Sequence, residues 1–535
     1  MNLYHNNTFL SRTPTITLSL ILLVVAGLLA GLYFSLRFEG KWAETDSANM
    51  VLASKGIEET GRLYGVEDQF IYLNGYNYQS LVMMLSQLTG IEIPAIQQLF
   101  LPLLLPLTML LAYLLLSEIS GSKYFGFLGA AIMMTQPELM FVVMRGSHEK
   151  IGRPLMLLAL LTLFWSLRSR KEPRKFLASI LMFYLAIYGY ISCNFLLGTS
   201  FLAALLFAML AAMVVRWLNN LSLRQNLKTA NNGVLSRLPL ASVVAAIFAF
   251  LFVFYLFPPA QHDLYQLGSI ADQLEGVLLS TSVEQIVDPS YGRVLKVWAN
   301  PSLFYVVSAA NWLVILVSFP IWLYLGYRWL LRGDSPPNVS AWLLWLLYGA
   351  FGFQGFLSIL VDAGTTYNNT VHRVFPSFSI LGVMIITYGL SRYYFDKGMP
   401  AFTKFGLAVS ILFLVLLSLL KATNEPSLVG WWVFYTQPEV QATQWQTDHI
   451  VEQKCWLGPT ERLMEANKTV TGVKNDWDVW SLDSVGIRCF FMSDYFRTQA
   501  ARLGLEIPYL GNKHVVYDNG SSQWFRSRPL TPYQR

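Results

Sequence analysis

The sequence predicts an all-α polytopic membrane protein with about eleven transmembrane helices and a small α/β domain at its carboxyl-terminal end. Of its 535 residues, 54% are hydrophobic and only 13% are charged, and the mean hydropathy is +0.44. Soluble globular chains carry about 25% charged residues. This composition therefore excludes an ordinary soluble enzyme, a disordered chain and a small disulfide-rich protein.

Eleven apolar runs are long enough to cross the hydrocarbon core of a bilayer, which takes about 17–25 residues. They lie at about 15–36, 94–116, 124–143, 152–167, 176–193, 197–217, 238–257, 303–327, 341–361, 374–391 and 405–420. The fifth and sixth runs are separated only by Ser192-Cys193-Asn194. This short break predicts a tight hairpin between two transmembrane helices.

Lys and Arg predict the orientation, because cytoplasmic loops carry the excess of these residues. The even-numbered connections hold fifteen basic and four acidic residues, and segment 168–175 alone has five basic residues. The loops at 37–93 and 258–301 hold instead eight and five acidic residues. We therefore expect the amino terminus inside and the carboxyl terminus outside. The net charge of +6 is explained by the inner loops, so we expect no nucleic-acid partner.

Residues 421–535 form the predicted extracytoplasmic domain, which follows a transmembrane domain at 1–420. This tail holds twelve basic and twelve acidic residues. Segments 439–453 and 495–503 are predicted as helices, and 514–517, before Asp518-Asn519-Gly520, as a strand entering a turn. Cys455 and Cys489 lie here. An oxidising compartment would allow them to form a disulfide, although spacing alone leaves this open.

Three groups of ionisable residues adjoin apolar runs on the predicted outer side, where an unpaired charge is costly. The first is Glu44-Thr45-Asp46, soon after the first run. Two carboxylates one residue apart can hold a metal ion or supply a general base. Alternatively, Asp46 is only the N-cap of a helix over residues 47–54.

The second group lies between the third and fourth runs. It places five ionisable side chains within nine positions: Arg145, His148, Glu149, Lys150 and Arg153. One alternative is a capped helix start, with Ser147 as the N-cap and Glu149 in the first turn. That alternative accounts for Ser147 and Glu149 better than for the remaining charges.

The third group is His372-Arg373, which opens the tenth run shortly before Pro376. A planar guanidinium group suits a phosphate, although an Arg here can also extend to the membrane interface without binding anything. Because all three groups fall on one side, they predict an outward-facing polar cavity. The chain has no Walker-type phosphate loop and no Asp, Glu or Lys in the middle of a span. ATP-driven transport and an ion-coupled carrier are therefore disfavoured.

With these features the chain resembles the GT-C superfamily of polytopic glycosyltransferases, which use polyprenyl-phosphate-linked sugars. The resemblance covers most of residues 1–420. It rests on the acidic pair Glu44 and Asp46, the long first loop leading through residues 75–80 and 88–91 into the second run, the Arg-rich loop after the third run, and His372-Arg373 followed by a soluble tail. Glu44-Thr45-Asp46 departs from the strict Asp-x-Asp motif of the family.

The resemblance implies transfer of a sugar from a polyprenyl-phosphate donor to an acceptor hydroxyl on the outer face of the membrane, normally with inversion. Asp46 would be the general base, with Glu44 orienting it. Arg373 and His372 would bind the donor phosphate, together with Arg145 or Arg153. His148 and Glu149, with Glu44 and Asp46, are candidate ligands of a divalent cation (Mg, Mn or Ca), or His148 and Glu149 bind the acceptor.

The implied partners are the lipid-linked donor, membrane lipids, and a glycan, lipid or protein acceptor. The implied location is the inner (plasma) membrane, with the active site and the tail outside. Two other functions fit parts of the pattern: a non-catalytic scaffold subunit, which would not depend on Asp46, and a lipid or glycan transporter, which would need polar groups at both faces.

Overall fold

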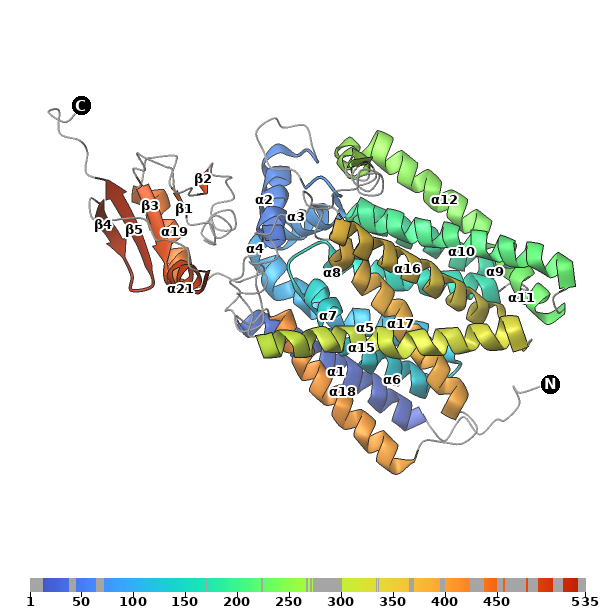
Figure 1. Ribbon diagram of the computed structural model, residues 1–535. Coiled ribbons are helices and arrows are strands. Elements are labelled where there is room, and N and C mark those ends of the chain that lie inside the picture. The colour runs from blue at the N-terminus through green and yellow to red at the C-terminus, as the bar shows by residue number, and fades with distance from the viewer. Residues whose placement is uncertain are drawn as a thin grey trace, which may run out of the picture.

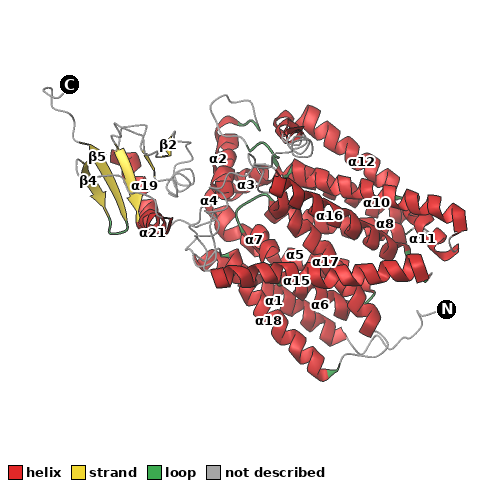
Figure 2. Ribbon diagram, viewed as in Figure 1, coloured by secondary structure: helices red, strands yellow, loops and turns green. Residues whose placement is uncertain are grey.

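The computed structural model consists of a helical bundle and a small sheet domain near the carboxyl terminus (Figure 1). Every described strand lies in the carboxyl-terminal part, and the bundle is helical (Figure 2). The structure describes residues 13–37, 45–63, 72–169, 172–222, 225–265, 301–332, 336–364, 370–394, 400–423, 437–449, 489–503 and 513–527, with a few single residues or pairs at 268–269, 272, 334, 456–457 and 478–479.

Within the described part of the chain, ten single helices are long and apolar enough to cross a membrane, and one bent pair brings the number to eleven. These spans coincide with the eleven predicted runs, so the predicted polytopic fold is confirmed. The helices are α1 (Thr13–Arg37), α5 (Leu105–Ser120), α8 (Glu149–Arg168), α9 (Pro173–Cys193), α10 (Phe195–Ser222), α12 (Leu238–Leu251), α15 (Pro301–Gly326), α16 (Val339–Gly364), α17 (Thr370–Tyr394) and α18 (Ala401–Ala422), with α6 (Lys123–Met134) and α7 (Pro137–Met144) as the bent pair.

Shorter elements extend or connect these spans. Helices α2 (Thr45–Thr60) and α3 (Asn77–Thr89) lie in the first long loop, which follows α1, and α11 (Gln225–Leu235) joins α10 to α12. Several spans are continued by brief helical segments: α4 (Ile93–Ala95), η2 (Ile96–Phe100) and η3 (Leu101–Leu104) before α5, η4 (Phe252–Leu256) and η5 (Pro258–Ala260) after α12, and η7 (Tyr327–Arg332) after α15.

The third span is bent, whereas the sequence predicted one continuous run over 124–143. Helices α6 and α7 meet at 79°. Pro137 opens α7, and Gln136 before it has the extended angles φ −94° and ψ 103°. A residue before proline is driven out of the helical region by a clash with the proline ring, so the chain turns here. Helix α7 then packs against α18 and α8 and carries Arg145 at its end.

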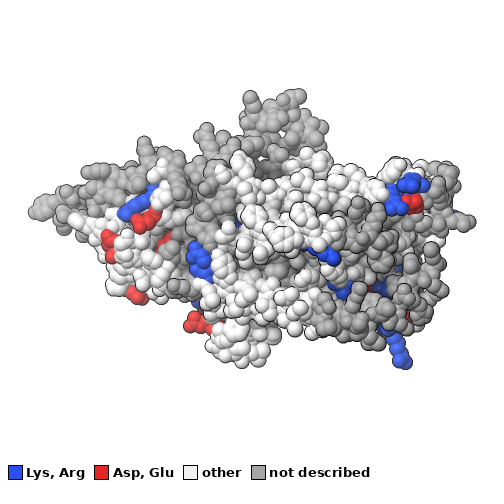
Figure 3. Space-filling view, turned by 90° about the horizontal axis from the view of Figure 1, so that it is seen from below, with Lys and Arg blue, Asp and Glu red and all other residues white. Residues whose placement is uncertain are grey.

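Helix α1 begins at the end of the bundle far from the sheet domain, whereas α2 and α3 lie at the end nearer to it (Figure 1). Most charged side chains that Figure 3 draws on one face lie toward the two ends, with a largely uncharged area between them. Which end faces the cytoplasm stays a prediction from the Lys and Arg count.

The carboxyl-terminal domain is a mixed sheet between two helices, and the sequence predicted a small α/β domain here. Its strand order is β2-β1-β3-β5-β4. Helix α19 (Gln437–His449) packs on Trp524 and Phe491, and α21 (Asp494–Leu503) follows β3 and packs through Phe496 on Phe490 and Phe525. The alternate residues of β3 (Cys489–Ser493) and β5 (Ser522–Ser527) thus face opposite helices. The other strands are β1 (Trp456–Leu457), β2 (Asp478–Val479) and β4 (Lys513–Asp518).

The cysteines differ in their states. Cys489 is disulfide-bonded, and Cys193 is free and buried. Cys455 lies outside the described residues. The boundary between the two predicted domains, at residue 420, falls within the last turns of α18 and stays a prediction.

Candidate functional site

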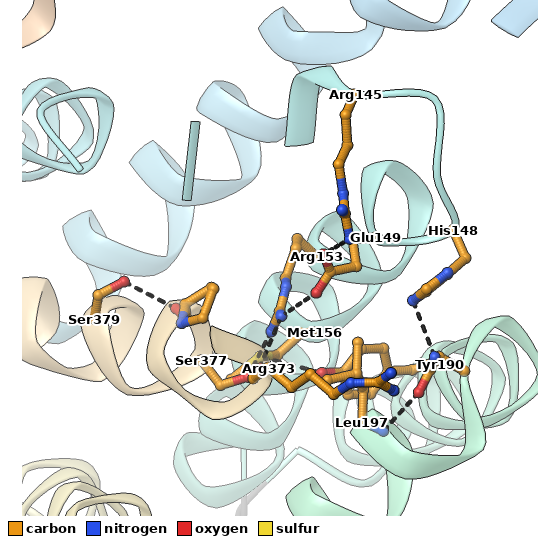
Figure 4. Close-up of polar contacts among 12 residues, drawn as sticks. Arg145, His148, Glu149, Arg153, Met156, Tyr190, Leu197, Arg373, Ser377 and Ser379 are labelled. Atoms are coloured by element: carbon orange, nitrogen blue, oxygen red, sulfur yellow. Dashed lines mark hydrogen bonds and ion pairs between the residues drawn. The ribbon is translucent and has the colours of Figure 1, made fainter. Parts of the chain in front are cut away.

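A buried ion-pair ladder occupies the start of α8, where the sequence places Arg145, Glu149 and Arg153 four residues apart. Arg145 Nη2 lies 3.1 Å from Glu149 Oε2, and Arg153 Nη2 lies 2.5 Å from Glu149 Oε1. The spacing puts Glu149 and Arg153 on one face of the helix, as Figure 4 shows. One carboxylate is thus shared by two guanidinium groups in the protein interior.

Arg153 joins this ladder to α17, a helix that lies much later in the sequence. Its side chain is 0% exposed. Nη1 donates to Ser377 Oγ at 2.5 Å, and Nη2 also donates to the backbone carbonyl of Arg373 at 3.3 Å. A buried charge needs such partners because its desolvation is costly. Arg153 therefore fixes the turn of α17 that carries Arg373.

His148 links three outer segments. Its Nε2 lies 2.9 Å from Asn194 Nδ2, and its Nδ1 lies 3.0 Å from the Tyr72 hydroxyl. Asn194 Oδ1 accepts from the Leu197 backbone N–H at 2.9 Å, which turns the amide nitrogen toward the imidazole. In this arrangement Nε2 accepts a hydrogen bond from the Asn194 amide.

The predicted helix cap at Ser147 is not formed. The N-cap residue of α8 is His148, without a side-chain cap hydrogen bond. Glu149, in the first turn of α8, forms ion pairs with Arg145 and Arg153. Its role is therefore more than a favourable interaction with the helix N-terminus. Next to it, the buried Lys150 donates from Nζ to the Gln97 carbonyl at 3.3 Å.

A second carboxyl group lies close by on the segment after η5. Asp263 is 1% exposed, and its Oδ1 accepts from Asn74 Nδ2. Burial raises the pKa of Asp263 above the ordinary value, and the Asn74 hydrogen bond and the charge of Arg373 oppose that rise. The Asn74 carbonyl in turn accepts from the Phe195 N–H at 2.7 Å, which joins the first outer loop to α10.

Gly75 allows this close approach. A Cβ atom at this position would lie 2.5 Å from the Ser192 carbonyl oxygen and 2.6 Å from that of Cys193. The neighbouring Tyr76 N–H donates to the same Ser192 carbonyl at 2.9 Å. Only glycine leaves room for the loop to lie on the α9–α10 hairpin, and the side chain of Asn74 is thereby placed on Asp263.

Arg373 extends from the start of α17 toward the first turn of α10, near Leu197 (Figure 4). The side chain is half-buried. Within the described part of the chain its guanidinium group has no hydrogen-bond or ion-pair partner, and only its backbone carbonyl is bonded, by Arg153. It is therefore a cation that the fold positions but does not neutralise.

The structure brings several of the predicted site residues together. Arg145, His148, Glu149 and Arg153 form one connected region, with Arg373 beside it. Glu44 lies outside the described residues. Asp46 falls in the first turn of α2 and His372 in that of α17, but their side chains lie outside the described part.

Sequence reasoning missed Asp263, Asn74, Asn194 and Ser377. Asp263 contributed only to the acidic excess of the loop at 258–301, and its sequence distance of 189 residues from Asn74 hides their contact. Ser377 lies 224 residues from Arg153. A usable signal existed for the ladder itself, because Arg145, Glu149 and Arg153 follow the i,i+4 spacing of helical ion pairs.

His148 and Glu149 do not fit a metal site in this geometry. Both oxygens of Glu149 accept from guanidinium groups that would repel a cation, and both ring nitrogens of His148 are bonded. Among the described residues, no group of three or more His, Cys, Asp or Glu side chains could hold a metal ion.

Comparison with known proteins connects this architecture to a fold. No protein-family model matches the chain, and no curated protein matches it in sequence. The crystal structure of the Archaeoglobus fulgidus oligosaccharyltransferase tethered with an acceptor peptide containing the NVT sequon is similar, with a TM-score of 0.53 and 11% identity over 97% of this chain and 74% of that chain.

The apo form of the same archaeal enzyme gives a TM-score of 0.52 at 10% identity, over 96% of this chain and 74% of that one. ArnT from Cupriavidus metallidurans bound to undecaprenyl phosphate gives 0.49 at 12% identity, over 96% of this chain and 98% of that one. The chain therefore shares its multi-pass helical fold with the archaeal oligosaccharyltransferase.

Proposed function

We propose that this protein is a membrane glycosyltransferase that moves a sugar from a polyprenyl-phosphate donor to an acceptor hydroxyl. The observation that carries the proposal is a surplus of positive charge in a largely buried site. Among the described residues of the site, the three guanidinium groups of Arg145, Arg153 and Arg373 stand against the two carboxyl groups of Glu149 and Asp263. A site of this sign suits an anionic group such as a phosphate.

Arg373 is the donor-phosphate ligand in this proposal, with His372 beside it on α17 and Arg145 nearby. A half-buried guanidinium group that forms no ion pair among the described residues interacts with a phosphate more strongly than it would in water, because the surroundings are of low dielectric. It also stabilises the charge that develops when the phosphate leaves. Arg153 is fully buried and both of its terminal nitrogens are bonded, to Ser377, Glu149 and the Arg373 carbonyl, so we assign it to positioning Arg373 and not to binding the donor.

Asp46 is the general base and Glu44 orients it. The acceptor hydroxyl gives its proton to Asp46 as its oxygen attacks the anomeric carbon. The bond from that carbon to the phosphate oxygen breaks, and its electron pair leaves with the lipid phosphate. Attack opposite to the leaving group inverts the anomeric centre. No step is assigned to a divalent cation, and any such ion would be held by Glu44 and Asp46 in preference to His148 and Glu149.

We place the site on the outer face of the inner membrane, from the excess of Lys and Arg in the opposite loops. The sheet domain then lies outside and binds or screens the acceptor, which is a glycan, a lipid or a protein. The likeness to an enzyme solved with a tethered acceptor peptide supports an acceptor substrate for this protein. The lipid chain of the donor would lie between spans.

The experiment is complementation of a deletion strain with Asp46→Asn, followed by mass spectrometry of the envelope glycoconjugates that the deletion removes. We expect Asp46→Asn to abolish the product, since a positioned base contributes about 10²- to 10⁴-fold to rate, with an unchanged melting temperature. The matched control is Glu58→Gln, an exposed acid on the same helix, which should restore the product fully.

Two results would contradict this assignment. Product formation by Asp46→Asn at the wild-type level would favour a non-catalytic scaffold. Loss of folded protein in Asp46→Asn alone would show that Asp46 serves the start of α2 and not the reaction.

A further inference from the structure

Within the described structure, one carboxylate oxygen of Asp263 accepts a hydrogen bond and the other accepts none. Oδ1 accepts from Asn74, and the Leu196 backbone N–H also interacts with the carboxyl group. Oδ2 is buried and has no hydrogen-bond partner within the described structure. A buried polar atom without a partner costs free energy, and native proteins rarely keep one without a reason. The fold fixes this carboxyl group through Oδ1 and leaves Oδ2 available to a hydrogen-bond donor from a ligand.

The guanidinium group that acts on this carboxyl group is that of Arg373. The two residues are close enough for the positive charge of Arg373 to act on Asp263. Arg373 also extends toward the first turn of α10 (Figure 4), the same turn whose Leu196 N–H meets Asp263. Nevertheless, the two form no ion pair, and neither free end has another partner among the described residues.

Opposite charges that approach without pairing leave room for a molecule that satisfies both. Such a molecule carries an anionic group for Arg373 and a hydrogen-bond donor for Asp263. A divalent cation does not meet this requirement, because Arg373 would repel it. A phosphate joined to a sugar does meet it, since the sugar hydroxyls are neutral donors held a few bonds from the phosphate.

We propose that Asp263 is a binding residue for the donor sugar, whose hydroxyl donates to Oδ2 while the attached phosphate is held by Arg373. This inference rests on the proposed function and adds to it a second subsite. Asn74 then acts as a positioning residue that fixes Oδ1. Recognition is selective, because a bare lipid phosphate satisfies Arg373 but leaves Asp263 unsatisfied.

The test compares binding of undecaprenyl phosphate with binding of undecaprenyl phosphates that carry glucose, mannose, galactose or arabinose. The variants are Asp263→Asn, Arg373→Ala and the control Asp272→Asn, an exposed acid on the same outer segment. A hydrogen bond to a charged group is worth roughly 10- to 100-fold in affinity. We expect the wild type to bind at least one sugar-loaded lipid that much more tightly than the bare lipid.

Asp263→Asn should abolish this preference while it binds the bare lipid as the wild type does, which also shows that the variant is folded. Arg373→Ala should weaken binding of both lipids, and Asp272→Asn should behave as the wild type. The proposal is overturned if the wild type shows no preference, if Asp263→Asn retains it, or if Asp263→Asn changes only the KM of the acceptor.

Failure of the proposed function would look different. In that case the wild type would bind neither the bare nor the sugar-loaded lipids. Binding of the bare lipid by wild type but not by Arg373→Ala would keep the donor-phosphate assignment, whatever the outcome for Asp263.

Discussion

Replacing Glu149 by Gln should destabilise the protein far more than the same change in a surface ion pair. Glu149 is the only described acceptor shared by Arg145 and Arg153, whose side chains are 9% and 0% exposed. The substitution removes the carboxylate that both guanidinium groups share in a low-dielectric interior. Breaking a buried pair from one side costs about 3–5 kcal/mol, because the remaining charge stays uncompensated.

The matched control is Glu118→Gln. Glu118 pairs with Arg168 at 2.8 Å, but the Arg168 side chain is 59% exposed. Exposed pairs contribute about 0.2–1 kcal/mol, since water screens the charges and solvates them when the pair is lost. Both variants would be unfolded by denaturant in mixed micelles, with circular dichroism as the measure of helix content.

A double substitution tests the reason for the effect. Arg145→Gln added to Glu149→Gln removes one of the two guanidinium groups that lost the shared carboxylate, so it should recover part of the lost free energy of unfolding. The reasoning is refuted if Glu149→Gln and Glu118→Gln lower stability equally, or if the second substitution lowers it further.

Two more predictions follow from the outer loops. Asp263 has a raised pKa in the folded state, so its contribution to stability is full below the ordinary pKa of Asp and is lost as pH rises through the raised value. The melting temperature of Asp263→Asn relative to wild type should therefore increase from about pH 4 to about pH 8; a constant difference would contradict the raised pKa. Gly75→Ala should lower the free energy of unfolding by about 1–3 kcal/mol through overpacking, because its Cβ would lie 2.5 Å from the Ser192 carbonyl oxygen. Gly406→Ala, which meets nothing within 4 Å, should cause no loss, and equal effects of the two changes on chemical unfolding would refute the steric argument.

The spans could be predicted from the sequence because their signal is local. A run of apolar residues determines a transmembrane helix by itself, since the bilayer core leaves the backbone no other way to satisfy its hydrogen bonds. The hairpin at residues 192–194 was likewise visible as a short polar break. The bend at Gln136-Pro137 has a local cause too, but its 79° angle depends on how α7 packs against α18.

The site was predictable only in part. The five charges between Arg145 and Arg153 stood out against the apolar runs, and the structure places Arg153 in contact with the Arg373 backbone carbonyl. Their pairing was harder to foresee, because Arg153 reaches Ser377 across 224 residues. Asp263 gave no signal, since an acid in an acidic outer loop is ordinary until the fold places Asn74 and Arg373 around it.

The measurement that tests the central claim most directly is mass spectrometry of the lipids that co-purify with wild type and with Arg373→Ala. Arg392→Ala, an exposed change at the other end of the same helix, is the control. The account predicts a polyprenyl phosphate, bare or sugar-loaded, with wild type and Arg392→Ala and its loss from Arg373→Ala. Only bulk phospholipid in all three samples would contradict a lipid-phosphate donor and favour a scaffold or a transporter.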